Sequence, residues 1–68
     1  NPNSGVFKIE MNIKDNYTVQ VMDVRGAILS KIKLEGNTLP IQINANPGIY
    51  LVRISSAEGT VTQRVQIL

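Results

Sequence analysis

The chain contains 68 residues with a formal net charge of +2, 43% hydrophobic residues, and neither cysteine nor histidine. This length allows a single domain, and the two missing residue types exclude disulfides, catalysis by either side chain and the usual structural zinc site. Because these reinforcements are excluded, burial of strand faces must supply nearly all of the stability. No apolar run reaches the ~20 residues of a membrane-spanning helix. We expect no cofactor and no metal. The chain begins at Asn1 without an initiator methionine or a signal peptide, and we expect it to be a piece of a longer protein.

Two alternating segments open the chain. Residues 6–13 alternate between apolar and polar side chains, which is the period-two pattern of a strand with one buried face. Residues 17–24 alternate in the same way, and the Asp15-Asn16 pair between the two segments predicts a turn. Val24 is out of phase with its segment, which predicts a β-bulge close by.

A hairpin should follow. Arg25-Gly26 predicts a tight turn, and residues 28–34 then alternate as a third strand, so the short connection makes the pair antiparallel. Asp23 lies just before this turn, where a carboxylate can accept hydrogen bonds from the backbone amides of the turn. We therefore expect Asp23 and Gly26 to be structural turn residues.

The next strand carries a proline. Residues 35–37 predict another turn, and residues 39–43 supply a further alternating apolar face. Pro40 lies inside this segment, and proline has no backbone N–H to donate to a sheet. The strand should therefore lie at an edge or begin at Pro40.

The strongest strand signal follows at residues 49–54. Pro47-Gly48 predicts the turn that precedes it, and Tyr50 begins an alternating face of β-branched and aromatic side chains. We expect this to be the central strand. The last segment, residues 60–68, alternates too, but Gln63 interrupts its apolar face, so the strand should be fully buried only after that residue.

Glycines 26, 36, 48 and 59 separate the apolar segments at intervals of 10 to 12 residues. Such regular spacing is typical of an all-β sandwich or barrel of short antiparallel strands. No segment shows a helical period. The sequence therefore predicts an all-β fold of about six strands, or seven if one bends between sheets, with essentially no helix.

The charged residues point to no nucleic-acid site. The seven lysines and arginines are scattered along the sequence, and we expect them to lie on solvated strand faces, with Lys31 and Lys33 forming at most a short basic stripe. Only three aromatic residues occur, so the basic residues have no interleaved aromatic partners, and we expect no binding to nucleic acid.

Nor do the residues form a catalytic group. None of the four serines lies in a Gly-x-Ser-x-Gly turn, and Lys31 is adjacent to Ser30 on a strand and therefore points to the opposite face. The five carboxylates lack the spacing of a calcium loop. Tyr17 and Tyr50 could stack on a sugar if they lay exposed side by side, but their apolar neighbours favour core packing. We expect a domain that is not an enzyme.

Five segments in order carry a resemblance to a known family. Residues 1–5 resemble a Pro-Asn-Pro-x-x-Gly opening, residues 6–9 the strand that follows it, and residues 19–26 a hydrophobic-Tyr-Asp-Leu-x-Gly segment. Residues 47–54 resemble a Gly-Ile-Tyr-hydrophobic-hydrophobic-Arg motif, and residues 59–68 the closing strand. Together they resemble the type A C-terminal sorting domain of the type IX secretion system of Bacteroidota, over nearly the whole chain.

The resemblance implies a function as an address on a secreted protein. Residues 1–68 would be the sorting domain of a larger protein, attached to an N-terminal cargo domain and folded as an immunoglobulin-like sandwich. Its partners would be the type IX translocon, an outer-membrane shuttle protein and a sortase that removes it, after transit through the periplasm to the cell surface or the medium. We expect recognition at the two motifs near the end of the chain, with Pro47 as a further turn residue; the recognition residues are Gly48, Ile49, Tyr50, Arg64, Val65, Gln66, Ile67 and Leu68.

Other possibilities remain at the level of sequence. The domain could instead be an accessory β-sandwich, either a carbohydrate-binding module or a module that stabilises the parent protein. Unprotected strand edges also make a strand-exchanged homodimer conceivable.

Overall fold

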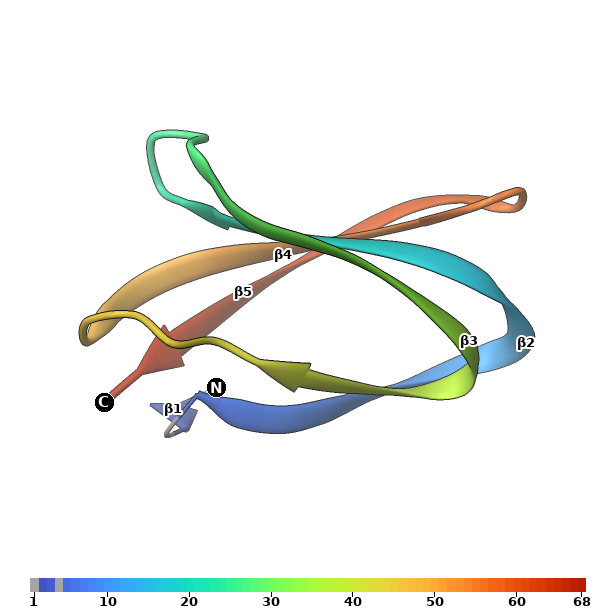
Figure 1. The fold of residues 1–68 in the computed structure, drawn as a ribbon, viewed down its shortest axis with the longest axis horizontal. Coiled ribbons are helices and arrows are strands. Elements are labelled where there is room, and N and C mark those ends of the chain that lie inside the picture. Colours follow the sequence, from blue (N-terminus) through green and yellow to red (C-terminus); the bar gives the residue numbers. More distant parts are fainter. Residues whose placement is uncertain (1, 4) are drawn as a thin grey trace.

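A computed structural model of the chain describes residues 2–3 and 5–68, and these residues form a single β-sheet. The sheet has the order β1-β5-β4-β2-β3, in which β2 to β5 form an open antiparallel sheet and the short β1 joins β5 in parallel (Figure 1). The described residues form no helix of the length and apolarity needed to cross a membrane. The strands are β1 (Pro2–Asn3), β2 (Val6–Asp23), β3 (Ile28–Gln42), β4 (Gly48–Ser56) and β5 (Gly59–Ile67).

The two longest strands bend together. The first part of β2, residues 6–10, pairs with residues 38–42 of β3, and its second part, residues 15–22, pairs with residues 28–36. Between these blocks, four residues of β2 lie opposite the single residue Asn37 of β3. Such a mismatch bends a strand pair sharply. The early part of β2 and the late part of β3 therefore fold over the rest of the sheet (Figure 1).

This bend corrects the predicted strand count. The sequence predicts six to seven short strands in a sandwich, but the structure has one open sheet, and the predicted turns at Asp15-Asn16 and residues 35–37 are bends within continuous strands. The backbone N–H of Asn16 donates to the Asp15 carboxylate over 2.7 Å, so turn chemistry is present there. The chain nevertheless does not reverse, because Asn16 pairs with Glu35 and continues the ladder.

The core lies between the folded-over half of the β2–β3 pair and the rest of the sheet. The residues of β2 in the core cluster have odd numbers on both sides of the bend, so Ile9 before the bend and Val19 after it contribute to one cluster. Leu39, Val19 and Val52 have no exposed surface. Each such side chain contributes about 1.5–3 kcal/mol when fully buried. The cluster consists of Ile9, Tyr17, Val19, Val21, Leu39, Ile41, Ile43, Tyr50, Val52, Ile54, Val65 and Ile67.

Several local expectations are confirmed. Pro40 lies on β3, which is an edge strand of the sheet. β2 and β3 form an antiparallel hairpin, with a register shift between Val21 and Met22 close to the predicted bulge. On β5, Val65 and Ile67 beyond Gln63 are buried, whereas Val61 before it is 48% exposed.

Gly5 closes the fold at the start of β2. Its carbonyl oxygen accepts a hydrogen bond of 2.7 Å from the backbone N–H of Ile43, just after β3. Gly5 has φ = 98°, and a Cβ placed on it would lie 2.6 Å from the Ile43 carbonyl oxygen. Both the backbone conformation and the available space therefore exclude a side chain there.

Replacing Gly5 tests this contact. We expect Gly5→Ala to lower the free energy of unfolding by more than the about 1–3 kcal/mol typical of a strained backbone residue, because the new methyl group also meets the Ile43 backbone. Gly26→Ala is a matched control, since Gly26 has φ = 93° but no atom lies within 4 Å of the place that its Cβ would take. Urea unfolding of both variants measures the difference. Equal losses would show that the contact with Ile43 adds nothing.

Candidate recognition site

The residues predicted for recognition lie together at one end of the sheet. Gly48, Ile49 and Tyr50 begin β4 and form three consecutive pairs with residues 65–67 of β5. Arg64 lies one step further along β5, opposite Leu51, and Leu68 directly follows the strand. The antiparallel register of β4 and β5 thus brings together two motifs that are separated by about a dozen residues in the sequence.

These residues divide between two faces of the sheet. Tyr50, Val65 and Ile67 point into the core and are at most 8% exposed. On the other face, Arg64 and Gln66 are exposed and Ile49 is half-buried. With Val65, these three line a shallow hollow of 230 Å³. A partner at this end can therefore contact Ile49, Arg64 and Gln66, whereas the buried residues act through the fold.

The outer edge of β5 is largely unpaired. β5 pairs with β4 from Gly59 to Ile67 on one side. On its other side, the described residues provide only β1, which pairs with Gln66 and Ile67. The intervening residues 59–65 therefore have no strand neighbour on that side within the described part of the chain. Such an edge offers backbone N–H and C=O groups to an incoming strand.

Tyr50 also holds the turn before β4. Its hydroxyl donates a hydrogen bond of 2.5 Å to the backbone carbonyl of Asn46, across the predicted turn residues Pro47 and Gly48. A Cβ on Gly48 would lie 3.8 Å from the Tyr50 ring, an ordinary van der Waals distance. The tyrosine thus fixes the path of the chain into β4 while its ring fills the core.

Tyr17 makes the same kind of contact at the bend of β2. Its hydroxyl donates to the backbone carbonyl of Ile13, four residues earlier, as Tyr50 does with Asn46. Burial, followed by the negative charges of Asp15 and Glu58, raises the pKa of Tyr17. Both tyrosine rings belong to the core, as their apolar neighbours predict, so they do not form the exposed platform that a carbohydrate module would require.

Asp23 organises the β2–β3 turn. Its Oδ1 accepts hydrogen bonds from the backbone N–H groups of Arg25 at 2.9 Å and Ala27 at 3.0 Å, and its Oδ2 contacts the Arg25 guanidinium at 3.1 Å. The backbone N–H of Gly26 donates to the Asp23 carbonyl at 3.0 Å. The hydrogen bond from Ala27 is the main reason that the pKa of Asp23 is lowered, with the Arg25 contacts adding to it.

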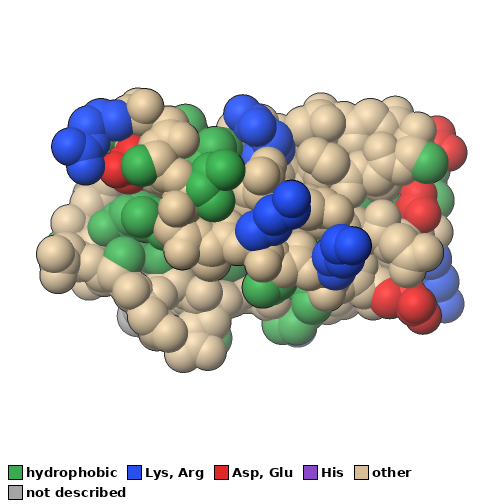
Figure 2. Space-filling model, turned by 45° about the horizontal axis from the view of Figure 1, so that its top comes forward, with side chains coloured by type: hydrophobic (Ala, Val, Ile, Leu, Met, Phe, Trp, Pro, Cys, Tyr) green, Lys and Arg blue, Asp and Glu red, His purple; other side chains and the backbone are tan. Residues whose placement is uncertain are grey.

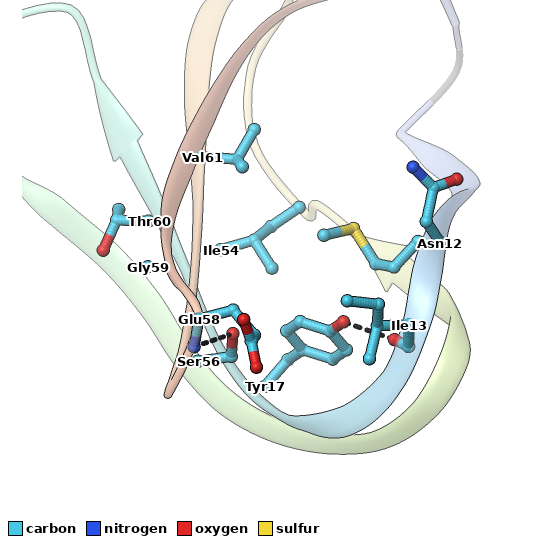
Figure 3. A pocket seen from close by; sticks show the side chains of 10 residues that line it. Asn12, Ile13, Tyr17, Ile54, Ser56, Glu58, Gly59, Thr60 and Val61 are labelled. Atoms are coloured by element: carbon cyan, nitrogen blue, oxygen red, sulfur yellow. Dashed lines mark hydrogen bonds between the residues drawn. The ribbon is translucent and has the colours of Figure 1, made fainter.

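A second hollow lies at the bend and was not predicted. It measures 340 Å³ and is lined by residues of the β2 bend and the β4–β5 turn (Figure 3). Ile54, Met11 and the Tyr17 ring form its apolar wall, and the Ser56 hydroxyl accepts a hydrogen bond of 3.2 Å from the backbone N–H of Glu58 at its rim. No sequence signal pointed to this hollow, because Ile13 follows the inward alternation of β2 and only the bend leaves it 51% exposed.

No metal centre lies among these side chains. Within residues 2–3 and 5–68, no three His, Cys, Asp or Glu side chains come together in a group that could hold a metal ion. Buried polar side-chain atoms in this part of the chain all have hydrogen-bond partners.

Comparison with known proteins gives one result. A family model described as the secretion system C-terminal sorting domain matches residues 1–68, the whole chain. Searches of curated proteins and of solved structures found no match.

Removing the Tyr50 hydroxyl should weaken the fold. We expect Tyr50→Phe to lower the free energy of unfolding by about 0.5–1.5 kcal/mol, because it deletes the hydrogen bond to Asn46 and retains the ring. Thr60→Val is the control, since the Thr60 hydroxyl lies at the surface and bonds the Ser55 hydroxyl there, at 3.2 Å. Chemical unfolding of both variants provides the comparison. A loss for Thr60→Val as large as that for Tyr50→Phe would contradict this role of Tyr50.

The turn carboxylate should make stability depend on pH. Asp23 has a lowered pKa in the folded chain, so its stabilising effect is complete above its unfolded pKa of about 3.9 and is lost as pH falls through the lower folded value. We expect Asp23→Ala to melt at a lower temperature than the unchanged chain at neutral pH, and the difference to shrink between about pH 4 and pH 2. Melting curves across this range test it. A constant difference would rule out the charged form of Asp23 as the cause.

Proposed function

Since this chain belongs to the family of secretion system C-terminal sorting domains, and so carries a type IX sorting signal, we propose that it directs an attached N-terminal cargo across the outer membrane. The cargo reaches the periplasm, the type IX translocon and its shuttle protein bind this domain, and a sortase removes it. The cargo is then anchored at the cell surface or released. The domain itself serves as the address and catalyses none of these steps.

The observation that carries this proposal is the unpaired edge of β5. A partner strand can add to residues 59–65 through main-chain hydrogen bonds, which any sequence of suitable shape provides. A secretion machine that handles many cargo proteins needs this tolerance. The address would then consist of a strand edge held at a fixed place by the core.

Side chains at the end of β5 supply the selectivity in this proposal. Arg64 and Gln66 are exposed beside Ile49, and Leu68 is 72% exposed at the end of the chain. A guanidinium group beside a partly exposed apolar side chain is a common anchor in protein interfaces. The buried members of the site, Tyr50 among them, hold these groups in register.

An immunoglobulin-like arrangement is the finer proposal for the fold. Its support is that β2 and β3 each consist of two paired halves, so the halves, β4, β5 and β1 together provide seven extended segments. The half of the β2–β3 pair that folds over would correspond to part of the second layer of such a sandwich.

Export of a reporter tests the function. Residues 1–68 are fused to the C-terminus of a periplasmic reporter in a host with a type IX system, and surface delivery is measured. We expect deletion of residues 64–68 to abolish delivery and Arg64→Ala with Gln66→Ala to reduce it by about fivefold or more, as for the loss of an interface anchor.

Two controls separate recognition from folding. Thr60→Ala with Thr62→Ala changes exposed residues of the same strand and the same face, and should leave delivery unchanged. Thermal melting establishes that both double variants fold. Full surface delivery after removal of residues 64–68 would refute the proposal.

A further inference from the structure

The outward face of the sheet carries a row of aligned side chains. Residues paired across neighbouring strands point to the same face, and Val19 and Val21 point into the core, so the alternate positions of β2 point outward. Gln20 is one of these, and it pairs with Lys31 of β3 and Arg53 of β4. Arg53 in turn pairs with Thr62 of β5, so the row crosses four strands.

Two more cations belong to the same face. In the row on one side, Lys33 pairs with Thr18; in the row on the other side, Arg64 pairs with Leu51. Neighbouring strands lie about 4.8 Å apart, so Lys31 and Arg53 are about 10 Å apart along their row. Four of the seven basic residues therefore share one face, although they are scattered along the sequence. We call this surface the basic face; its cations are Lys31, Lys33, Arg53 and Arg64, all of them exposed.

Carboxylates lie around the basic face and not within it. Glu35 lies at the bend, two residues beyond Lys33 and on the same face of β3, where it borders the basic face. Asp23 lies at the β2–β3 turn and Glu58 at the β4–β5 turn. In the described residues the only ion pair within 4 Å joins Arg25 to Asp23, so no carboxylate is paired with a cation of the basic face. Figure 2 shows basic side chains across the middle of one face and acidic side chains only toward its ends.

Apolar side chains adjoin the cations. Ile28, Met22 and Leu51 form the row that ends in Arg64. In this row Met22 is buried and Leu51 is half-buried, whereas Ile28 is 56% exposed. Val24 on the neighbouring turn is 66% exposed. Cations beside exposed aliphatic groups suit the boundary of an anionic bilayer, which offers phosphates to the charges and acyl chains to the apolar groups.

Other polyanions fit this face less well. The three aromatic side chains lie at inward positions, so the face lacks the stacking groups that single-stranded nucleic acid requires. The exposed aliphatic side chains of Ile28 and Val24 beside the cations favour the boundary of an anionic bilayer over a wholly acidic protein surface.

We propose that the basic face binds an anionic lipid surface through Lys31, Lys33, Arg53 and Arg64. The cations contact headgroup phosphates, and the apolar end at Ile28 and Val24 enters the boundary with the acyl chains. This activity goes beyond the sorting function, because it requires no protein partner. It would hold the domain against a membrane through the face that also carries Arg64 and Gln66, while the unpaired edge of β5 remains free for a partner strand.

Vesicle binding tests the proposal. The 68-residue chain is mixed with vesicles of phosphatidylglycerol and phosphatidylcholine in equal parts, or of phosphatidylcholine alone, and the bound fraction is measured by sedimentation. We expect binding only to the anionic vesicles and a decrease with added salt. Lys31→Glu with Arg53→Glu should lower the partition coefficient by at least about tenfold.

A matched variant distinguishes the face from net charge. Lys8→Glu with Lys14→Glu changes the net charge by the same amount at exposed positions outside the basic face, and should retain binding within about threefold. Circular dichroism establishes that both variants fold. Equal losses in the two variants, or no binding of the unchanged chain, would overturn the proposal. Binding to polyglutamate without binding to vesicles would assign the face to an acidic protein and would overturn it as well. The assay contains no secretion machinery, so its failure leaves the reporter experiment unaffected.

Discussion

The fold depends on the doubling over of the β2–β3 pair. An open sheet of four strands buries one face only if something covers it, and the described residues include no helix, disulfide or metal site to do so. The first half of β2 and the last half of β3 bring Ile9, Leu39 and Ile41 over the inward face of the other strands. The chain therefore builds its second layer by bending its own longest hairpin.

Three hydrogen bonds to backbone groups hold this arrangement where the chain bends, starts a strand or turns. Tyr17 holds the bend of β2 through the Ile13 carbonyl, and Gly5 holds the start of the strand through Ile43. Tyr50 does the same for the turn into β4. Each of these hydrogen bonds is made to the backbone, so it fixes the path of the chain whatever the neighbouring side chains are. The exposed edge of β5 and the basic face both depend on that path.

Local pattern predicted the extended segments and which side chains face inward, but not the way the segments join. Asp15-Asn16 and residues 35–37 have the composition of turns, and the same residues also suit a bend. Whether the chain reverses is decided by distant pairing, here of Tyr17 with Leu34 on one side of the bend and Ile9 with Leu39 on the other. The unbroken parity of the inward residues of β2 was the available sign of one continuous strand.

The surface was less predictable for the same reason. Lys31, Arg53 and Arg64 are far apart in the sequence, and only the register of four strands places them on one face. The grouping of Gly48, Ile49 and Tyr50 with the end of β5 likewise depends on the register. A family resemblance identified both segments, although local pattern alone could not show that they meet.

The parallel pairing of β1 with β5 has a mechanical consequence. Pro2 pairs with Gln66 and Asn3 with Ile67, so the chain leaves this pair in opposite directions at its two ends. Tension between a tethered N-terminus and a C-terminus that is pulled must slide the two strands along each other, and both ladder positions resist at once. Pulling β4 and β5 apart at their open end, where Gly48 pairs with Ile67, would instead separate their pairs one after another, which requires less force.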